Sequence, residues 1–170
     1  MEKASSRVIE VTVISGEDLR VNRRTPLKKN AFVIVRSDPL NPRSTGMNTE
    51  GGCNPIWNEK LVMDLPLHAS FITVEVHCKV RSGSKIIGTS RIPLSDFTGG
   101  YLPVNYLSFL SYRLRDANGE KNGIINLSVK VNGPTNMSCA TSRSRLWFGG
   151  PMNNKFSNGI VTGIPVSYRS

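Results

Sequence analysis

The stretch FITVEVHC, residues 71–78, alternates apolar and polar side chains at every second position over most of its length. A period of two is typical of a half-buried β-strand, whereas a helix repeats every 3.6 residues. The pattern places Ile72 and Val76 on one face of the strand. Glu75 and His77 fall on the other face, so this segment is predicted to be a strand with one side against a core.

Similar short β-branched runs occur along most of the chain, separated by turns rich in Gly, Pro, Asn and Ser. There is no long amphipathic helix and no internal repeat. The expected strands are 8–14, 31–36, 44–49 (the weakest), 60–65, 71–78, 86–93, 107–115 and 123–131, with a helical turn at 94–97. This pattern predicts an all-β protein, an eight-stranded antiparallel Greek-key β-sandwich.

The composition changes after Val131, where Asn, Gly, Ser and Pro become frequent. We therefore expect one domain over residues 1–132 and a basic, Ser/Asn/Gly-rich, largely irregular tail over residues 133–170. Within the tail, RSRLWF at 143–148 joins positive charge to aromatic side chains. It could touch a membrane interface or remain solvated.

The formal net charge of +10 favours anionic partners, which are nucleic acid, an acidic protein or an anionic membrane leaflet. The positive charge is concentrated in two loops, within acid-free stretches at 19–37 and 76–95. If both loops lie at one end of the sandwich, they form one anion-binding surface, and Pro26 and Leu27 could dip into the headgroup region. The residues predicted to bind anionic lipid are Arg23, Arg24, Lys28, Lys29, Lys79, Arg81 and Lys85.

Enzymatic and nucleic-acid functions have little support in the sequence. His77 and Cys78 are neighbours on a strand, so their side chains point to opposite faces and cannot act as a base and a nucleophile. Aromatic residues are missing from both basic loops, and Phe32, Phe71 and Trp57 fall in contexts that suit a core. No enzyme activity and no nucleic-acid partner are expected.

The segment Asn54-Pro55-Ile56-Trp57-Asn58-Glu59 resembles the NPxWNE motif of C2 domains. In this resemblance, which covers about residues 7–132, Asn54, Pro55, Trp57 and Asn58 form a structural staple with a buried Trp. The first strand is similar to the second strand of synaptotagmin-type C2 domains. The resemblance therefore implies the phospholipase-type topology, with the strand at 123–131 beside the first.

Within the C2 family, the chain is most similar to small single-C2 plant proteins of the SRC-type and copine-associated (BON-associated) groups. The segments VIEVTVISGEDLR and NGIINLSVKV carry much of this closer match. The resemblance implies a cytoplasmic protein, peripheral on the inner face of the plasma membrane. It also implies a copine-like or other membrane-associated protein as partner and a role in restraining defence-type cell death.

Calcium-dependent C2 domains hold the ion with loop aspartates, because Ca²⁺ takes 6–8 oxygen ligands. Aligned on the family pattern, those positions carry no carboxylate in this chain. They are occupied by Asn22, Asn30, Cys78, Val80 and Lys85. We expect no metal and no cofactor, and hence calcium-independent binding to anionic phospholipid. Two alternatives remain: an adaptor whose basic loops bind an acidic protein, and a calcium-dependent C2 domain.

Overall fold

A computed structural model of the chain describes residues 6–133. The tail predicted for residues 133–170, including the 143–148 segment, lies outside the described residues except for Gly133. The strands are β1 (Ser6–Glu17), β2 (Arg20–Asn22), β3 (Thr25–Pro26), β4 (Ala31–Arg36), β5 (Pro42–Ser44), β6 (Ile56–Pro66), β7 (Phe71–Val80), β8 (Gly83–Pro93), β9 (Leu107–Arg115) and β10 (Lys121–Val131), with a 3₁₀ turn, η1, at Leu94–Asp96.

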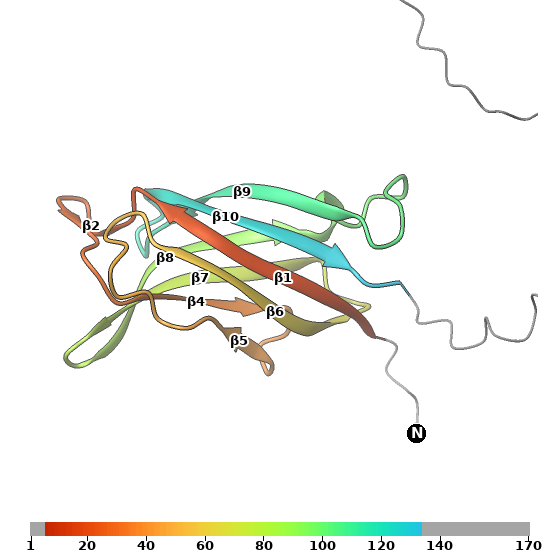
Figure 1. The fold of residues 1–170 in the computed structure, drawn as a ribbon, viewed down its shortest axis with the longest axis horizontal. Helices are drawn as coiled ribbons and strands as arrows, with labels where there is room; N and C mark the ends of the chain where they lie inside the picture. The colour runs from red at the N-terminus through yellow and green to blue at the C-terminus, as the bar shows by residue number, and fades with distance from the viewer. Residues whose placement is uncertain (1–5, 134–170) are drawn as a thin grey trace, which may run out of the picture. The chain divides into compact units, whose positions relative to one another are not determined.

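Eight of these strands form the predicted antiparallel sandwich (Figure 1). Hydrogen bonding gives the order β5-β4-β7-β8-β9-β10-β1-β6. Strands β8 and β9 pair only at Thr89 and Arg115, whereas the other neighbours pair over several residues. The strands therefore divide into two four-stranded layers that are joined at this single pair. The two remaining strands, β2 and β3, form a separate small hairpin.

The last strand lies beside the first, as the phospholipase-type topology requires. Strand β10 pairs antiparallel with β1 from Ile9↔Val131 to Glu17↔Ile124. On its other side β1 pairs with β6. The predicted topology is therefore confirmed.

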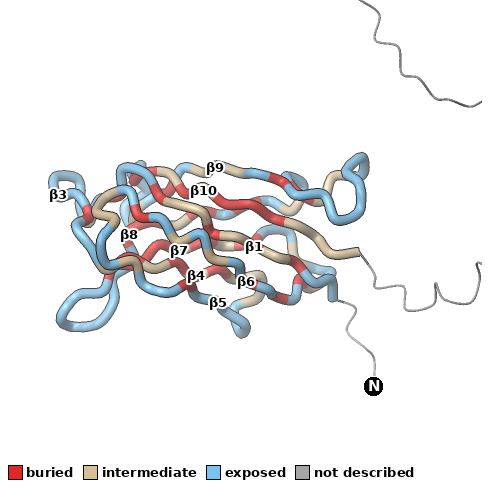
Figure 2. Tube along the Cα trace, viewed as in Figure 1, coloured by how far each residue is buried: buried red, intermediate tan, exposed pale blue. Residues whose placement is uncertain are grey.

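The core lies between the two layers, where alternate side chains of the strands meet. Ile9, Val11 and Val13 of β1 are fully buried, as are Ile72 and Val74 of β7. Figure 2 shows these buried positions as short segments along the strands, with exposed chain at both ends of the sandwich. The alternation that predicted the strands is thus the alternation that fills the core.

The weakest predicted strand, at 44–49, is wrong in extent. Strand β5 ends at Ser44, and beyond it only an isolated bridge joins Asn48 to Ala31. The backbone N–H of Val33 donates to the Thr45 hydroxyl at 3.0 Å instead of to a backbone carbonyl. The Thr45 N–H still donates to the Val33 carbonyl at 2.9 Å, so the side chain replaces one of the two backbone bonds of the next residue pair, and the strand stops there.

The outer edge of β6 is covered by side chains and a loop from the opposite layer. Ser37 Oγ donates to the Asp64 carbonyl at 2.5 Å, and Arg43 Nε donates to the Val62 carbonyl at 3.1 Å. The Gly46 N–H donates to Glu59 Oε2 at 2.7 Å. These contacts tie β5 and its flanking chain to β6 across the sandwich.

Four connections lie at one end of the sandwich, on the left in Figure 1, because successive strands run in opposite directions. We call this end the tip. It comprises the first loop (residues 18–30), the second loop (45–55), the end of the β7–β8 hairpin (79–85), which we call the third loop, and the β9–β10 turn (116–120). The basic loop predicted at 79–85 is shorter than expected, because β7 continues to Val80 and β8 begins at Gly83.

Candidate functional site

The first and third loops are joined at the tip. The Lys79 N–H donates to the Asn30 carbonyl at 2.9 Å, and Lys85 Nζ donates to the Val21 carbonyl at 3.1 Å. The first loop folds into the β2–β3 hairpin, where Asn22 Oδ1 accepts the N–H groups of Arg24 and Thr25. The assumption that the two basic loops meet is therefore correct.

The Asn54–Glu59 segment fastens the second loop to the first. Asn54 Oδ1 accepts the Asp18 N–H at 2.9 Å, and Trp57 Nε1 donates to the Ala31 carbonyl at 3.1 Å. Pro55 is buried, and Asn58 has a positive φ of 50°. Trp57 is half-buried, not fully buried as expected, because its ring packs at the margin of the core.

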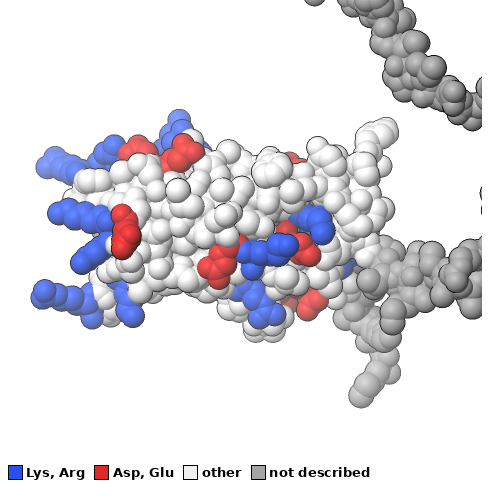
Figure 3. Space-filling view, in the orientation of Figure 1, with Lys and Arg blue, Asp and Glu red and all other residues white. Residues whose placement is uncertain are grey.

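Lysine and arginine side chains gather at the tip (Figure 3). Two of the seven predicted lipid-binding residues are already engaged, since Arg23 pairs with Glu120 and Lys85 holds the Val21 carbonyl. The other five make no ion pair and no side-chain hydrogen bond with any residue from 6 to 133. These are Arg24, Lys28, Lys29, Lys79 and Arg81, and all five are exposed.

The prediction that Leu27 contacts a membrane is wrong. Leu27 is only 2% exposed and belongs to the core cluster. Its N–H donates to the carbonyl of Leu19 at 2.9 Å, which turns the end of the loop back over the buried Leu19. Pro26 is exposed and remains available at the surface.

The five positions that align with calcium ligands offer little to a cation. Asn30 has a positive φ of 64°, and Lys85 brings a positive charge to the site. Cys78 is buried, its Sγ lies 3.6 Å from the Lys29 carbonyl, and burial raises the pKa of its thiol. Within residues 6–133 no group of three or more His, Cys, Asp or Glu side chains could hold a metal ion.

Sequence reasoning missed the acids that the β9–β10 turn brings to the tip, Asp116 and Glu120. Glu120 forms the ion pair with Arg23. Asp116 Oδ1 accepts the N–H groups of Asn118 and Glu120 at 2.9 and 3.0 Å. The position of these acids could have been predicted from the strand order. Because successive antiparallel strands run in opposite directions, the β9–β10 turn must lie at the same end of the sandwich as the basic loops.

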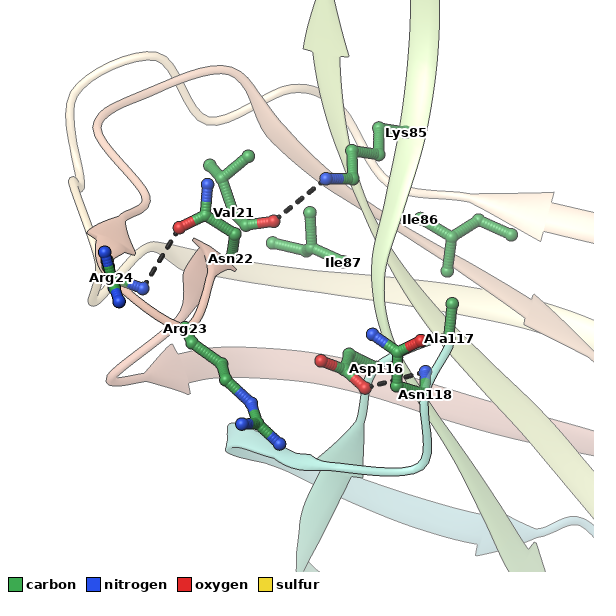
Figure 4. A pocket seen from close by; sticks show the side chains of 10 residues that line it. All are labelled: Val21, Asn22, Arg23, Arg24, Lys85, Ile86, Ile87, Asp116, Ala117 and Asn118. Atoms are coloured by element: carbon green, nitrogen blue, oxygen red, sulfur yellow. Dashed lines mark hydrogen bonds between the residues drawn. The ribbon is translucent and has the colours of Figure 1, made fainter.

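Asp116, but not Glu120, borders a cleft of about 450 Å³ on one flank of the tip (Figure 4). One wall is the β2–β3 hairpin with Arg23 and Arg24. The second is the start of β8 with Lys85, and the third is the β9–β10 turn with Asp116 and Asn118. The cleft therefore combines three cationic side chains with one carboxylate.

His77 and Cys78 occupy opposite faces of β7, as predicted. Cys78 belongs to the core cluster, whereas the His77 ring stacks on Phe32 at 5.1 Å between centroids, and His77 Nε2 lies 3.0 Å from Glu75 Oε2. The expectation that Phe32 and Phe71 lie in the core is wrong. Phe32 is only partly buried and does not belong to the core cluster, and Phe71 is 40% exposed with the Arg91 guanidinium 4.9 Å from its ring centre.

A second cleft, of about 830 Å³, lies at the end opposite the tip. It is bordered by the start of β1, the end of β10 and the connection between η1 and β9. Apolar side chains there face solvent, with Val104 70% and Tyr106 50% exposed and Tyr101 fully exposed nearby. No helix within residues 6–133 is long and apolar enough to cross a bilayer.

Comparison with known sequences gives a consistent picture. The sequence model described as "C2 domain" matches residues 7–108. A relative from Arabidopsis thaliana, "BON1-associated protein 2", is 45% identical over 130 residues. The alignment covers 74% of this chain but only 61% of that relative, so this chain spans less than two thirds of its length.

Several solved structures share the fold at low sequence identity. A C2 domain of plant Extended Synaptotagmin 1 aligns with a TM-score of 0.60 at 15% identity, covering 74% of this chain and 94% of that one. A C2 domain-containing protein from a putative elicitor-responsive gene gives 0.58 at 19% identity, covering 80% and 99%. Human GIVD cytosolic phospholipase A2 gives 0.60 at 14%, covering 79% of this chain but 17% of the enzyme.

Proposed function

Because this chain belongs to the C2 domain family, we propose that it is an adaptor that docks on anionic phospholipid membranes without calcium. The tip makes the contact, and no catalytic step is involved. The observation that carries the proposal is the set of five exposed cations of the first and third loops. Arg24, Lys28, Lys29, Lys79 and Arg81 have no anionic partner among residues 6–133.

Electrostatic attraction is sufficient for reversible docking. Each Lys or Arg close to an anionic leaflet contributes about 1 kcal/mol, so several together give binding that weakens as salt screens the charges. Exposed apolar side chains lie among these cations at Pro26, at Val80 (40% exposed) and at Ile86 (47% exposed). Leu27 is buried and contributes only to the shape of the loop.

Calcium independence rests on the ligand positions themselves. A dication needs hard anionic oxygens, and Asn22, Asn30, Cys78, Val80 and Lys85 supply no carboxylate. Lys85 also adds repulsion at the point where loops one and three meet. We therefore propose that positive side chains attract lipid where calcium does so in calcium-dependent relatives.

The test is sedimentation with phosphatidylglycerol-containing vesicles, in chelator and in calcium. Lys28→Glu/Lys29→Glu should weaken binding by at least about 30-fold, because two attractive charges become repulsive. Arg7→Glu/Arg91→Glu makes the same change in net charge away from the tip and should have a much smaller effect. Binding that requires calcium, or that falls equally in both variants, would contradict the proposal.

A second candidate function is protein binding at the end opposite the tip. The printed name of the Arabidopsis relative states an association with BON1, and the apolar cleft beside Val104 and Tyr106 offers a surface for such contact. We propose a copine-type, membrane-associated protein as this partner, on the inner face of the plasma membrane and in the restraint of defence-type cell death.

The two functions are separable by mutation. Tyr101→Asp/Val104→Asp should abolish pull-down of a BON1-type protein and leave vesicle binding unchanged. Lys28→Glu/Lys29→Glu should do the reverse. If only the tip variant loses the protein partner, the basic loops themselves bind that protein. This result would favour an adaptor with an acidic protein partner over an adaptor that docks on lipid.

A further inference from the structure

The cleft on the flank of the tip is bipolar, which distinguishes it from the rest of the positive surface. Its lining residues include Arg23, Arg24, Lys85 and Asp116. Arg23 extends toward the β9–β10 turn, whereas Arg24 lies at the outer side of the hairpin (Figure 4). Figure 4 shows these side chains coming from three separate segments of the chain. A ligand that only carries negative charge would gain from the cations and be repelled by the carboxylate.

The Asp116 carboxylate has one oxygen available for a ligand. Oδ1 accepts two backbone N–H groups of its own turn, from Asn118 and Glu120. Oδ2 has no hydrogen bond or ion pair to any other residue from 6 to 133. This oxygen therefore offers a negatively charged acceptor at the edge of a basic cleft, and its natural complement is a cationic donor such as an ammonium group.

The cations of the cleft also retain free donors. Arg23 uses one guanidinium nitrogen on Glu120, and Arg24 has no side-chain partner among the described residues. Lys85 donates one of its three ammonium hydrogens to the Val21 carbonyl at 3.1 Å. Planar guanidinium groups match phosphate oxygens in pairs, so this side of the cleft suits a phosphate group.

We propose, on the basis of the membrane docking proposed above, that this cleft recognises aminophospholipid headgroups. The headgroup phosphate contacts Arg23, its primary ammonium contacts Asp116 Oδ2, and Arg24 adds positive charge at the outer side of the hairpin. A serine headgroup adds a carboxylate, for which Lys85 supplies a partner. Lipids with the phosphate but no amine leave Asp116 facing an anionic surface unpaired, and a choline headgroup cannot donate a hydrogen bond to it.

The test uses the full chain and vesicles matched in charge. Phosphatidylserine is compared with phosphatidylglycerol, and phosphatidylethanolamine replaces part of the phosphatidylcholine in a constant phosphatidylglycerol background. We expect about tenfold tighter binding to each amine-bearing lipid, the effect of one charge-assisted hydrogen bond. Asp116→Asn keeps the acceptor oxygen for the two turn N–H groups and should abolish both preferences. Asp64→Asn, the same change on β6 outside the tip, should preserve them.

Equal binding of phosphatidylserine and phosphatidylglycerol by the unmodified chain would overturn amine recognition while leaving anionic docking intact. Failure to bind either lipid would instead defeat the docking proposal itself. An Asp116→Asn variant that keeps the lipid preference, with an unchanged urea midpoint to show that it folds, would likewise place the recognition elsewhere.

Soluble compounds separate the headgroup from the bilayer. Glycerophosphoethanolamine should shift the amide NMR signals of residues 116–118 and compete with vesicles, whereas glycerol 3-phosphate should compete less well. A third competitor is a peptide containing phosphoserine, which carries a phosphate without a free ammonium beside it. If that peptide competes as well as glycerophosphoethanolamine, the cleft binds phosphate without recognising the ammonium, and the proposal is wrong.

Discussion

Lys85 Nζ lies 3.1 Å from the carbonyl oxygen of Val21, so a lysine of the third loop holds the first loop in place. The backbone bond from Lys79 to Asn30 joins the same two loops at their base. Lys85, one of the predicted lipid-binding cations, therefore also stabilises the position of the first loop. Removing it tests how far the tip depends on this single contact.

Lys85→Met should loosen the β2–β3 hairpin while leaving the sandwich intact. An exposed hydrogen bond of this kind contributes about 1 kcal/mol or less, so the midpoint of urea unfolding should change little. Amide hydrogen exchange at residues 21–25 should become faster. Lys79→Met removes the same charge without a side-chain contact, and equal exchange in both variants would show that Lys85 does not hold the loop.

Leu27→Ala should destabilise the whole domain, because Leu27 is part of the core. Truncating a buried leucine costs about 2–5 kcal/mol, measured as the free energy of unfolding in urea. Leu40→Ala is the matched control, since Leu40 is 85% exposed and its loss should cost almost nothing. A small effect at Leu27, together with weaker vesicle binding, would restore its predicted role at the membrane.

Gly123→Ala should be far more damaging than Gly119→Ala. Both glycines have positive φ, 69° and 80°, so each substitution carries a backbone penalty of about 1 kcal/mol. At Gly123 the new Cβ would also clash with the Glu17 carbonyl and fall 2.9 Å from the Asp18 carbonyl and 3.0 Å from Leu19, whereas at Gly119 nothing lies within 4 Å. The free energies of unfolding of the two variants, compared with the parent, isolate this steric contribution, and equal losses would contradict it.

The carboxyl of Glu10 should titrate below its ordinary pKa of 4.5. A hydrogen bond from Asn132 is the main cause, and Lys60 at 3.3 Å also favours the ionised form. A lowered pKa in the folded state means that the stabilisation is present above pH 4.5 and is lost as the pH falls through the folded value. Asn132→Ala should move the pKa back toward 4.5 in an NMR titration of the Glu10 side chain.

The strand pattern was predictable because it depends on local alternation. Residues 31–36 and 107–115 match β4 and β9 in extent, since each run of alternating side chains ends where turn residues begin. The weak strand at 44–49 failed for a non-local reason. The Thr45 hydroxyl, 12 positions along the chain, takes the Val33 N–H that a longer β5 would need, and no periodicity signals that contact.

The site was predictable in its charges but not in its contacts. Arg24, Lys28 and Lys79 could be identified from sequence because an acid-free run of bases must remain solvated or meet an anion. The burial of Leu27 could not, because it follows from a backbone bond to Leu19 across the loop. The pairing of Arg23 with Glu120 likewise joins segments brought together only by the order of the strands.

The side chains that cover the edge of β6 also bear on how the protein behaves at high concentration. An exposed strand edge is a template for pairing with another chain, and its open carbonyls are what an incoming strand would bind. Ser37 and Arg43 already occupy the carbonyls of Asp64 and Val62. These acceptors are therefore not available to a strand of a neighbouring molecule, which protects this side of the sandwich from edge-to-edge aggregation when many copies are close together.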